Sequence, residues 1–278
     1  MSHTGPPAVL SIAGSDSGGG AGIQADLKAF AACGVHGMTA ITAITAQNTV
    51  GVSRVDAVAP EMIVEQVRMV AEDIGVDAVK IGMLGTAETI AAVVEALDLV
   101  GDAPVVLDPV MVAESGAVLL DPQASRALIE QALPRADVAT PNLAEARELT
   151  GLGDDASQED LARAVLDVGP DAVIVTSGHT EEGTDLFFDG AEAVKISGPR
   201  HPDGAAHGSG CTHSSALAAG LALGESPLQA AQRARELAAA AVAGGLEGIG
   251  EGAGPVDALG VERGIGTPRA AARASGAP

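Results

Sequence analysis

A short segment in the last third of the chain combines a glycine turn, a helix start and a thiol. Residues 205–220 read AAHGSGCTHSSALAAG, so a Gly-Ser-Gly turn runs directly into a predicted helix of small residues that begins at Cys211. Backbone N–H groups are free at a helix start, and the helix dipole adds about half a positive charge there. Anionic oxygen is the ligand that such an end binds. The segment therefore predicts phosphate chemistry, with Cys211 as a participant.

A second glycine-rich loop, residues 14–22, lies between a predicted strand and a predicted helix. Residues 20–25 fit the dinucleotide pattern Gly-x-Gly-x-x-Ala, but that site also needs a tight turn and an acid at the end of the second strand. Here the loop is long and the second strand ends in Ala-Gln-Asn at 46–48, which argues against a nicotinamide or flavin site. No Gly-Lys-Ser or Gly-Lys-Thr follows the loop, so a P-loop is excluded. We expect the loop to approach a ligand closely.

Short β-rich runs alternate with helical stretches through most of the chain. The runs predicted as strands are 8–13, 38–46, 52–58, 78–81, 105–108, 138–140 and 172–176, with a hairpin of 186–188 and 193–196. The segments predicted as helices are 22–32, 62–73, 86–99, 125–133, 143–150, 158–168, 211–223 and 227–243. This order favours a mostly parallel sheet covered on both faces, with the active site at the carboxyl ends of the strands. We expect one α/β domain over 1–260 and a flexible tail over 261–278.

The composition limits the partners. The formal net charge is −22, with 37 acidic against 15 basic residues, and such a surface repels nucleic acid and anionic membranes. A salt-rich cytoplasm and a genomic bias toward Ala and away from Lys both remain open as explanations. Two cysteines do not make a disulfide framework, and they show no zinc-like spacing with the histidines. With no signal peptide and no apolar run of ~20 residues, we expect a soluble, cytoplasmic protein.

The stretch 9–52, VLSIAGSDSGGGAGIQADLKAFAACGVHGMTAITAITAQNTVGV, closely resembles the hydroxymethylpyrimidine/phosphomethylpyrimidine kinases of thiamine biosynthesis, within the ribokinase-like superfamily. The resemblance recurs at 80–84, 107–111, 140–145, 207–212 and 254–256. It implies a three-layer α/β/α ribokinase-like fold and the use of ATP and Mg²⁺. It further implies phosphorylation of 4-amino-5-hydroxymethyl-2-methylpyrimidine and of its monophosphate, by a homodimer.

The resemblance assigns the catalytic step to the glycine turn. The members of the turn are Gly208, Ser209, Gly210 and Cys211. In the superfamily the Gly-x-Gly turn is an anion hole for the transferring phosphoryl group, and the next residue, here Cys211, is often an Asp that acts as base. Because a helix start lowers the pKa of a thiol, we expect part of Cys211 to be thiolate that accepts the hydroxyl proton. A role for Cys211 in orienting that hydroxyl, or in packing alone, stays open.

The resemblance also implies a pyrimidine pocket. Its residues are Gly14, Asp26, Gln47, Met83 and Val110. Asp26 would contact the pyrimidine substituents, and the amide of Gln47 can both donate to and accept from a heterocycle edge. A Gln at this position resembles the pyrimidine enzymes rather than those that favour pyridoxal. A surface role for Asp26 and a capping role for Gln47 remain as simpler alternatives.

On the nucleotide side the resemblance implies a phosphate and metal assembly. The nucleotide-binding residues are Asn142, Thr176, Gly178 and His207. Asp108 and Glu145 resemble positions that hold Mg²⁺ and phosphate, and Mg²⁺ takes few protein carboxylates. Glu145 has the alternative of merely favouring a helix N-terminus.

Two positions depart from the family pattern. Thr176 stands where the family carries Lys, and Glu114 stands where it carries a second Lys. A lost contact of Lys with phosphate is worth ~1–3 kcal/mol in a partly desolvated site. A monovalent cation such as K⁺ is one way to replace that charge. These two replacements leave open a pyrimidine-binding sensor without catalysis, and the shared fold leaves open a pyridoxal-type vitamin kinase.

Overall fold

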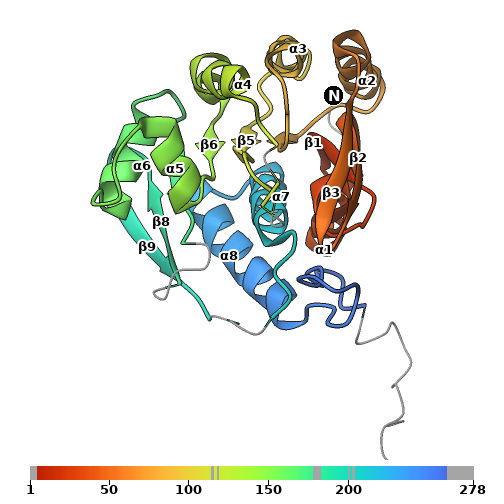
Figure 1. The fold of residues 1–278 in the computed structure, drawn as a ribbon. Coiled ribbons are helices and arrows are strands. Elements are labelled where there is room, and N and C mark those ends of the chain that lie inside the picture. The colour runs from red at the N-terminus through yellow and green to blue at the C-terminus, as the bar shows by residue number, and fades with distance from the viewer. Residues whose placement is uncertain are drawn as a thin grey trace, which may run out of the picture.

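The computed structural model describes residues 5–113, 116–117, 119–177, 183–199, 201 and 204–261. Within these residues the strands form one nine-stranded sheet in the order β3-β2-β1-β4-β5-β6-β7-β8-β9 (Figure 1). The strands are β1 (Ala8–Asp16), β2 (His36–Asn48), β3 (Gly51–Ala57), β4 (Ala78–Ile81), β5 (Val105–Leu107), β6 (Val138–Ala139), β7 (Ala172–Val175), β8 (Thr184–Phe188) and β9 (Ala193–Ser197). The pairs that join β2 through β7 are parallel, and β3, β8 and β9 attach antiparallel.

Helices cover both faces of the sheet, which confirms the expected three-layer α/β/α arrangement (Figure 1). One face packs against α2 (Pro60–Asp73), α3 (Ala87–Leu97), α4 (Pro122–Ala127), α5 (Leu143–Thr150) and α6 (Gln158–Leu166). The opposite face packs against α1 (Gly22–Cys33), α7 (Ser209–Ala222) and α8 (Pro227–Ala243). Because both faces are covered, β4, β5 and β7 are buried at every residue.

Helix α7 lies at the centre of its layer and is built from small residues. Its residues from Thr212 to Gly220 are all buried, and it packs along α8. A Cβ on Gly220 would lie 2.8 Å from the Cβ of Ala230 in α8, so the two helices approach at a distance that only small side chains permit. Small side chains therefore let α7 pack closely between the sheet and α8.

Two elements differ most from the expected ranges, and the others agree with them to within two residues at each end. Strand β1 runs to Asp16 rather than ending at 13, because pairing with β2 resumes at Ser15 and Asp16 after a register shift. The predicted helix 125–133 is instead α4, a π-helical turn η1 (Leu128–Ala132) and a 3₁₀ turn η2 (Leu133–Arg135). Pro134 lacks the N–H that would continue the α-helical ladder through this segment. The predicted hairpin across Asp189-Gly190 is confirmed as β8 and β9.

In the part of the chain that the structure describes, no helix has the length and apolar character needed to cross a bilayer. The predicted tail 261–278 lies outside the described residues apart from Val261, as do Glu114 and Gly178.

Candidate active site

The predicted anion turn lies between the glycine-rich loop and the start of α7. Gly208 is the N-cap of α7 with a left-handed φ of 85°, and no side chain caps the helix. A Cβ on Gly208 would lie 1.8 Å from the carbonyl oxygen of Gly20, whereas a Cβ on Gly210 would meet nothing within 4 Å. The turn thus contacts the backbone of the glycine-rich loop at Gly208, and it is open at Gly210. An uncapped helix start with open space beside it is suited to bind an anion.

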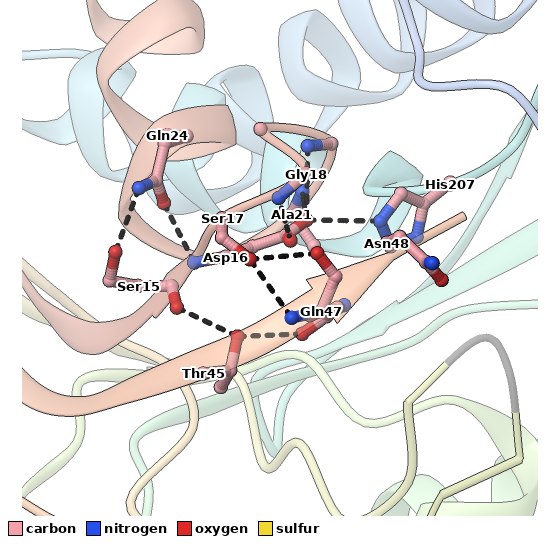
Figure 2. A network of polar contacts seen from close by, with 12 residues as sticks. Ser15, Asp16, Ser17, Gly18, Ala21, Gln24, Thr45, Gln47, Asn48 and His207 are labelled. Carbon is pink, nitrogen blue, oxygen red and sulfur yellow. Dashed lines mark hydrogen bonds and ion pairs between the residues drawn. The ribbon is translucent and has the colours of Figure 1, made fainter. Parts of the chain in front are cut away.

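The glycine-rich loop is organised by a carboxylate that the sequence left unassigned (Figure 2). Asp16, 3% exposed, accepts the backbone N–H groups of Gly18 at 2.7 Å, Gly20 at 3.0 Å and Ala21 at 2.9 Å. Its Oδ2 also lies 3.1 Å from Nε2 of His207, the residue before the anion turn. We call Asp16 and His207 the loop anchor. It joins the two glycine segments that the sequence singled out.

Burial by itself raises the pKa of Asp16, but the hydrogen bonds from His207, Ala21 and Gly18 outweigh it and hold this pKa below its ordinary value. The carboxyl group is therefore ionised at neutral pH and can only accept hydrogen bonds. It follows that Nε2 of His207 carries a hydrogen and donates a hydrogen bond to Asp16. The expected nucleotide contact of His207 stays a prediction, because this nitrogen faces Asp16 in the structure.

A second polar network lies beneath the turn, in the core of the molecule. Asp26 of α1 and Lys80 of β4 form an ion pair of 2.9 Å between Oδ1 and Nζ, and both side chains are 0% exposed. Asp26 also accepts from Ser11 of β1 at 2.6 Å and from Ser215 of α7 at 2.8 Å. We call these four residues the core anchor. Because three protein donors occupy the buried Asp26 carboxylate, its direct contact with a pyrimidine stays a prediction.

One face of α7 brings the thiol and the two anchoring serines together. Cys211, Ser214 and Ser215 are spaced three and four residues apart, which places them on the same side of the helix. Ser215 binds Asp26, and Ser214 donates to Asp108 at 2.9 Å. Cys211 therefore lies one helical turn before the two serines that bind the carboxylates of Asp108 and Asp26.

The structure corrects the expectation that Cys211 is partly thiolate. Burial raises the pKa of the Cys211 thiol to about 12, with the positive charge of Lys80 opposing that rise. The carboxylates of Asp26 and Asp108 raise this pKa further, and the backbone N–H of Gly22 lowers it. The effect of the helix start on the thiol pKa is thus outweighed by burial and, after it, by two acids from other elements. At neutral pH the residue is a neutral thiol.

Asp108 and Glu145 lie at the carboxyl edge of the sheet and repel one another. Burial raises the pKa of Asp108, although Lys80 and Ser214 lower it. Burial and then the charge of Asp108 raise the pKa of Glu145 to about 8. Two carboxylates that repel one another are costly to ionise together unless a cation lies near them. Carboxylate oxygens are also the ligands that a hard divalent cation such as Mg²⁺ prefers. No cluster of three or more His, Cys, Asp or Glu ligands occurs among the described residues.

Glu145 also has the structural role that the sequence left open. Asn142 is the N-cap of α5, accepting from the N–H groups of Ala144 at 2.9 Å and Glu145 at 3.0 Å. Glu145 Oε2 accepts in return from the N–H of Asn142 at 2.9 Å, which completes a capping box. A β-bridge sets Asn142 beside Thr176, whose N–H donates to Pro141 at 2.9 Å. Asn142, Glu145 and Thr176 therefore lie on one rim.

The expected pocket residues on the substrate side fall into two groups. A Cβ on Gly14 would lie 3.0 Å from Sδ of Met83, so these two residues are adjacent. Val110 lies two residues after Asp108, and its N–H donates to the Asp108 carbonyl at 2.8 Å. Gln47 lies apart, in a hollow of about 460 Å³ that none of Gly14, Asp26, Met83 and Val110 lines. Its backbone exchanges hydrogen bonds with the hydroxyl of Ser17, the neighbour of Asp16 (Figure 2).

Five polar residues around the turn are not predicted by motif or spacing. They are Ser11, Asp16, Lys80, Ser214 and Ser215. One signal was available, because Lys80 is one of only three lysines and sits in a strand predicted as buried. A charge in such a strand requires a buried partner. The serines gave no signal, since small residues recur throughout that helix.

The chain is similar to one kinase family over most of its length. The family model described as phosphomethylpyrimidine kinase matches residues 16–257. The hydroxymethylpyrimidine/phosphomethylpyrimidine kinase of Rhizobium meliloti strain 1021 is 52% identical over 254 residues, covering 89% of this chain and 95% of the relative. The protein of the same name from Streptomyces coelicolor is 46% identical over 255 residues, covering 91% of this chain and 94% of the relative.

Solved structures agree with this similarity. The pyridoxal kinase of Staphylococcus aureus in complex with ADP has a TM-score of 0.83 at 37% identity, covering 93% of this chain and 95% of that one. The phosphomethylpyrimidine kinase of Clostridium difficile 630 has a TM-score of 0.73 at 41% identity, covering 82% of this chain and 96% of that one. On its sequence and its fold, the chain belongs to the phosphomethylpyrimidine kinase family.

Proposed function

We propose that this chain transfers the γ-phosphoryl group of ATP to the hydroxymethyl oxygen of 4-amino-5-hydroxymethyl-2-methylpyrimidine, and then phosphorylates the monophosphate. Relatives at 44–52% identity carry both activities in their names. The observation that carries the proposal is the uncapped start of α7, which opens at the carboxyl edge of the sheet beside Asp108.

The anion turn supplies most of the catalysis in this proposal. Phosphoryl transfer passes through a loose transition state, so positioning and electrostatic stabilisation dominate. The N–H groups of Gly210 and Cys211, reinforced by the α7 dipole, would bind the transferring group as its charge redistributes, whereas the N–H of Ser209 donates to the Ala206 carbonyl at 3.0 Å. The hydroxymethyl oxygen forms a bond to the γ-phosphorus while the bond from phosphorus to the ADP oxygen breaks.

Cys211 has the role of orienting the hydroxyl rather than of removing its proton first. A thiol whose pKa is raised to about 12 stays protonated at neutral pH, so it offers a hydrogen bond and little base strength. The hydroxyl proton then leaves late, as the new bond to phosphorus forms, and passes to an oxygen of the transferred phosphoryl group, which suits a loose transition state.

On the nucleotide side, Asp108 and Glu145 are the residues that would hold Mg²⁺, which when bound neutralises phosphate charge. Asn142 and Thr176 lie on the same rim and would contact the phosphates with the Asn142 amide N–H₂ and the Thr176 hydroxyl. The homodimer is proposed from the resemblance alone, and the cytoplasmic location remains the expectation drawn from the sequence. Light scattering on the purified protein tests the homodimer.

The test is ADP release with the hydroxymethylpyrimidine and Mg·ATP, measured for the parent chain and for Cys211→Ala. We expect turnover by the parent that requires the pyrimidine, and a lower kcat for Cys211→Ala with little change in the KM for ATP. Absence of turnover by the parent, with thermal stabilisation by the pyrimidine, would instead identify a sensor without catalysis.

Pyridoxal is the second candidate substrate, because the pyridoxal kinases of Staphylococcus aureus and Bacillus subtilis match this fold with TM-scores of 0.82 to 0.84. Gln47 favours the pyrimidine, since its amide presents both a donor and an acceptor. Competition between the two substrates in one assay measures the ratio of their kcat/KM values and decides the preference.

A further inference from the structure

The proposed reaction gives no role to the two residues of the loop anchor. His207 lies directly before Gly208, and Asp16 lies at the end of β1, 191 residues away along the chain. Their contact is nearly closed to solvent, with Asp16 3% and His207 7% exposed. Four donors bind this buried carboxylate, three from the glycine-rich loop and one from His207. A movement of either segment would leave donors without their partner, so the contact restricts both segments.

Backbone contacts hold His207 from the other side as well. Its N–H donates to Gly254 at 3.2 Å, and its carbonyl accepts from Val256 at 3.1 Å. The side chain faces the glycine-rich loop, while the backbone pairs with the segment 254–256. The residue is therefore fixed at both its side chain and its main chain, immediately before the turn that must bind phosphate.

The fit between the two glycine segments is close enough to transmit a displacement. A Cβ on Gly20 would lie 2.1 Å from Cδ2 of His207, and a Cβ on Gly208 would lie 1.8 Å from the Gly20 carbonyl oxygen. The imidazole ring and the loop backbone are thus in contact with no intervening side chain. If the ring were removed, Gly20 would lose the side chain that it contacts, and the backbone against which Gly208 rests could shift.

The loop anchor also continues toward the substrate side. Ser17 follows Asp16, donates its hydroxyl to the carbonyl of Gln47 at 2.7 Å and accepts from the N–H of Gln47 at 2.9 Å (Figure 2). The same short loop therefore contacts the expected heterocycle-binding residue at one point and His207 at the next.

We propose that His207 and Asp16 are positioning residues for phosphoryl transfer: the Nε2–H of His207 donates to Asp16 and thereby fixes residues 208–211 against the glycine-rich loop. This inference rests on the proposed function, and it gives His207 a role different from a nucleotide contact. The neutral or protonated ring acts through Asp16 and touches neither substrate. A displacement of the turn by about 1 Å is enough to cost on the order of 100-fold in rate.

The kinetic test compares His207→Ala, His207→Gln and Asp16→Asn with the parent in the same ADP-release assay. For His207→Ala we expect kcat to fall by about 10- to 100-fold, with the KM values of both substrates changed by less than that factor. His207→Gln should recover part of the loss, because its amide can donate from nearly the position of Nε2. The matched control is His36→Ala, because His36 is an exposed histidine at the start of β2, at the other end of that strand from Gln47.

A double-mutant cycle supplies the specific signature of a pair. If the two residues act as one unit, Asp16→Asn combined with His207→Ala lowers kcat no further than the worse single variant. An increase in the KM for ATP alone would overturn the inference and restore His207 as a nucleotide contact, and so would full additivity of the two losses.

A second readout does not depend on turnover. Amide hydrogen exchange over residues 204–214 should be faster in Asp16→Asn than in the parent, although Asp16 lies on β1. Unchanged exchange in this peptide would overturn the inference even if the parent had no kinase activity. Failure of the proposed function appears separately, as a parent chain without turnover.

Discussion

Two polar networks hold the start of α7, and they differ in burial and in charge. The core anchor is an ion pair between fully buried side chains, tied by hydroxyl groups to β1 and α7. The loop anchor is a carboxylate and an imidazole that lie closer to the surface, and three backbone N–H groups of the glycine-rich loop also donate to its carboxylate. A buried ion pair is costly to break because the remaining charge has no partner, whereas a loop can relax when a hydrogen bond is lost. The core anchor should therefore govern stability, and the loop anchor should govern the geometry of the anion turn.

The largest effect is expected when the core anchor loses its only positive charge. Lys80→Met leaves the carboxylate of Asp26 buried without a counter-charge, and we expect a loss of about 3–5 kcal/mol in the free energy of unfolding. Urea unfolding of the purified variant measures this loss.

Lys195→Met is the matched control, because Lys195 is an exposed lysine of β9. Adding Asp26→Leu to Lys80→Met should recover much of the stability, since the unpaired charge is then removed as well. A loss below about 1 kcal/mol for Lys80→Met would show that the ion pair does not support the fold.

The link from the core anchor to α7 is the next test. Ser215→Ala removes one hydrogen bond to a buried carboxylate, and we expect a loss of about 1.5–3 kcal/mol in the free energy of unfolding. Thermal unfolding beside Ser197→Ala, an exposed serine of β9, measures the difference. Equal stability of the two variants would mean that α7 is held by packing alone.

The loop anchor should respond to acid through the carboxyl group of Asp16. The pKa of Asp16 is held below its ordinary value of 3.8, so its contribution to stability is complete above that value and is lost as the pH falls through the lower folded pKa. At neutral pH we expect Asp16→Asn to cost about 1–2 kcal/mol. In urea unfolding at decreasing pH, the parent's advantage should shrink below 3.8. An advantage that is constant down to strong acid would contradict this.

The smallest expected effect concerns the thiol between the two anchors. The pKa of Cys211 is raised to about 12, so the protonated form persists and is lost only in strong alkali. We therefore expect no ionisation of Cys211 in the kcat/KM profile between about pH 6 and about pH 9, and slow alkylation by iodoacetamide. A rise in rate near the ordinary thiol pKa of about 8.5, absent in Cys211→Ser, would show a thiolate base instead.

The local elements could be predicted from sequence more fully than the site. The strand predicted at 78–81 is β4 to the residue, because its apolar character and its flanks are local properties. The helix predicted at 125–133 was wrong, because Asp121 and Pro134 impose a cap and a break that periodicity does not register. Hydrophobic spacing also ended β1 too early, where pairing with a neighbouring strand extends it.

The site depends on contacts between distant parts of the chain. Asp26 and Lys80 are separated by 54 positions, and Asp16 and His207 by 191. Motif spacing located the anion turn, yet the charges that raise the pKa of its thiol come from α1 and from the end of β5. The protonation state of Cys211 could not be derived from its helix position, since burial and two carboxylates oppose the helix dipole. Such contributions to the pKa arise only when the elements pack together.

The most direct measurement is the phosphorylation of 4-amino-5-hydroxymethyl-2-methylpyrimidine, followed by ³¹P NMR for the parent and for Gly208→Ala. A Cβ at this left-handed position would lie 1.8 Å from the Gly20 carbonyl oxygen, so the anion turn must move while the core anchor stays intact. We expect the parent to form the monophosphate and then the diphosphate, and the variant to lose at least about 100-fold in kcat with its unfolding transition still cooperative. Absence of phosphorylated pyrimidine with the parent, or an undiminished rate in Gly208→Ala, would contradict the assignment of phosphoryl transfer to this turn.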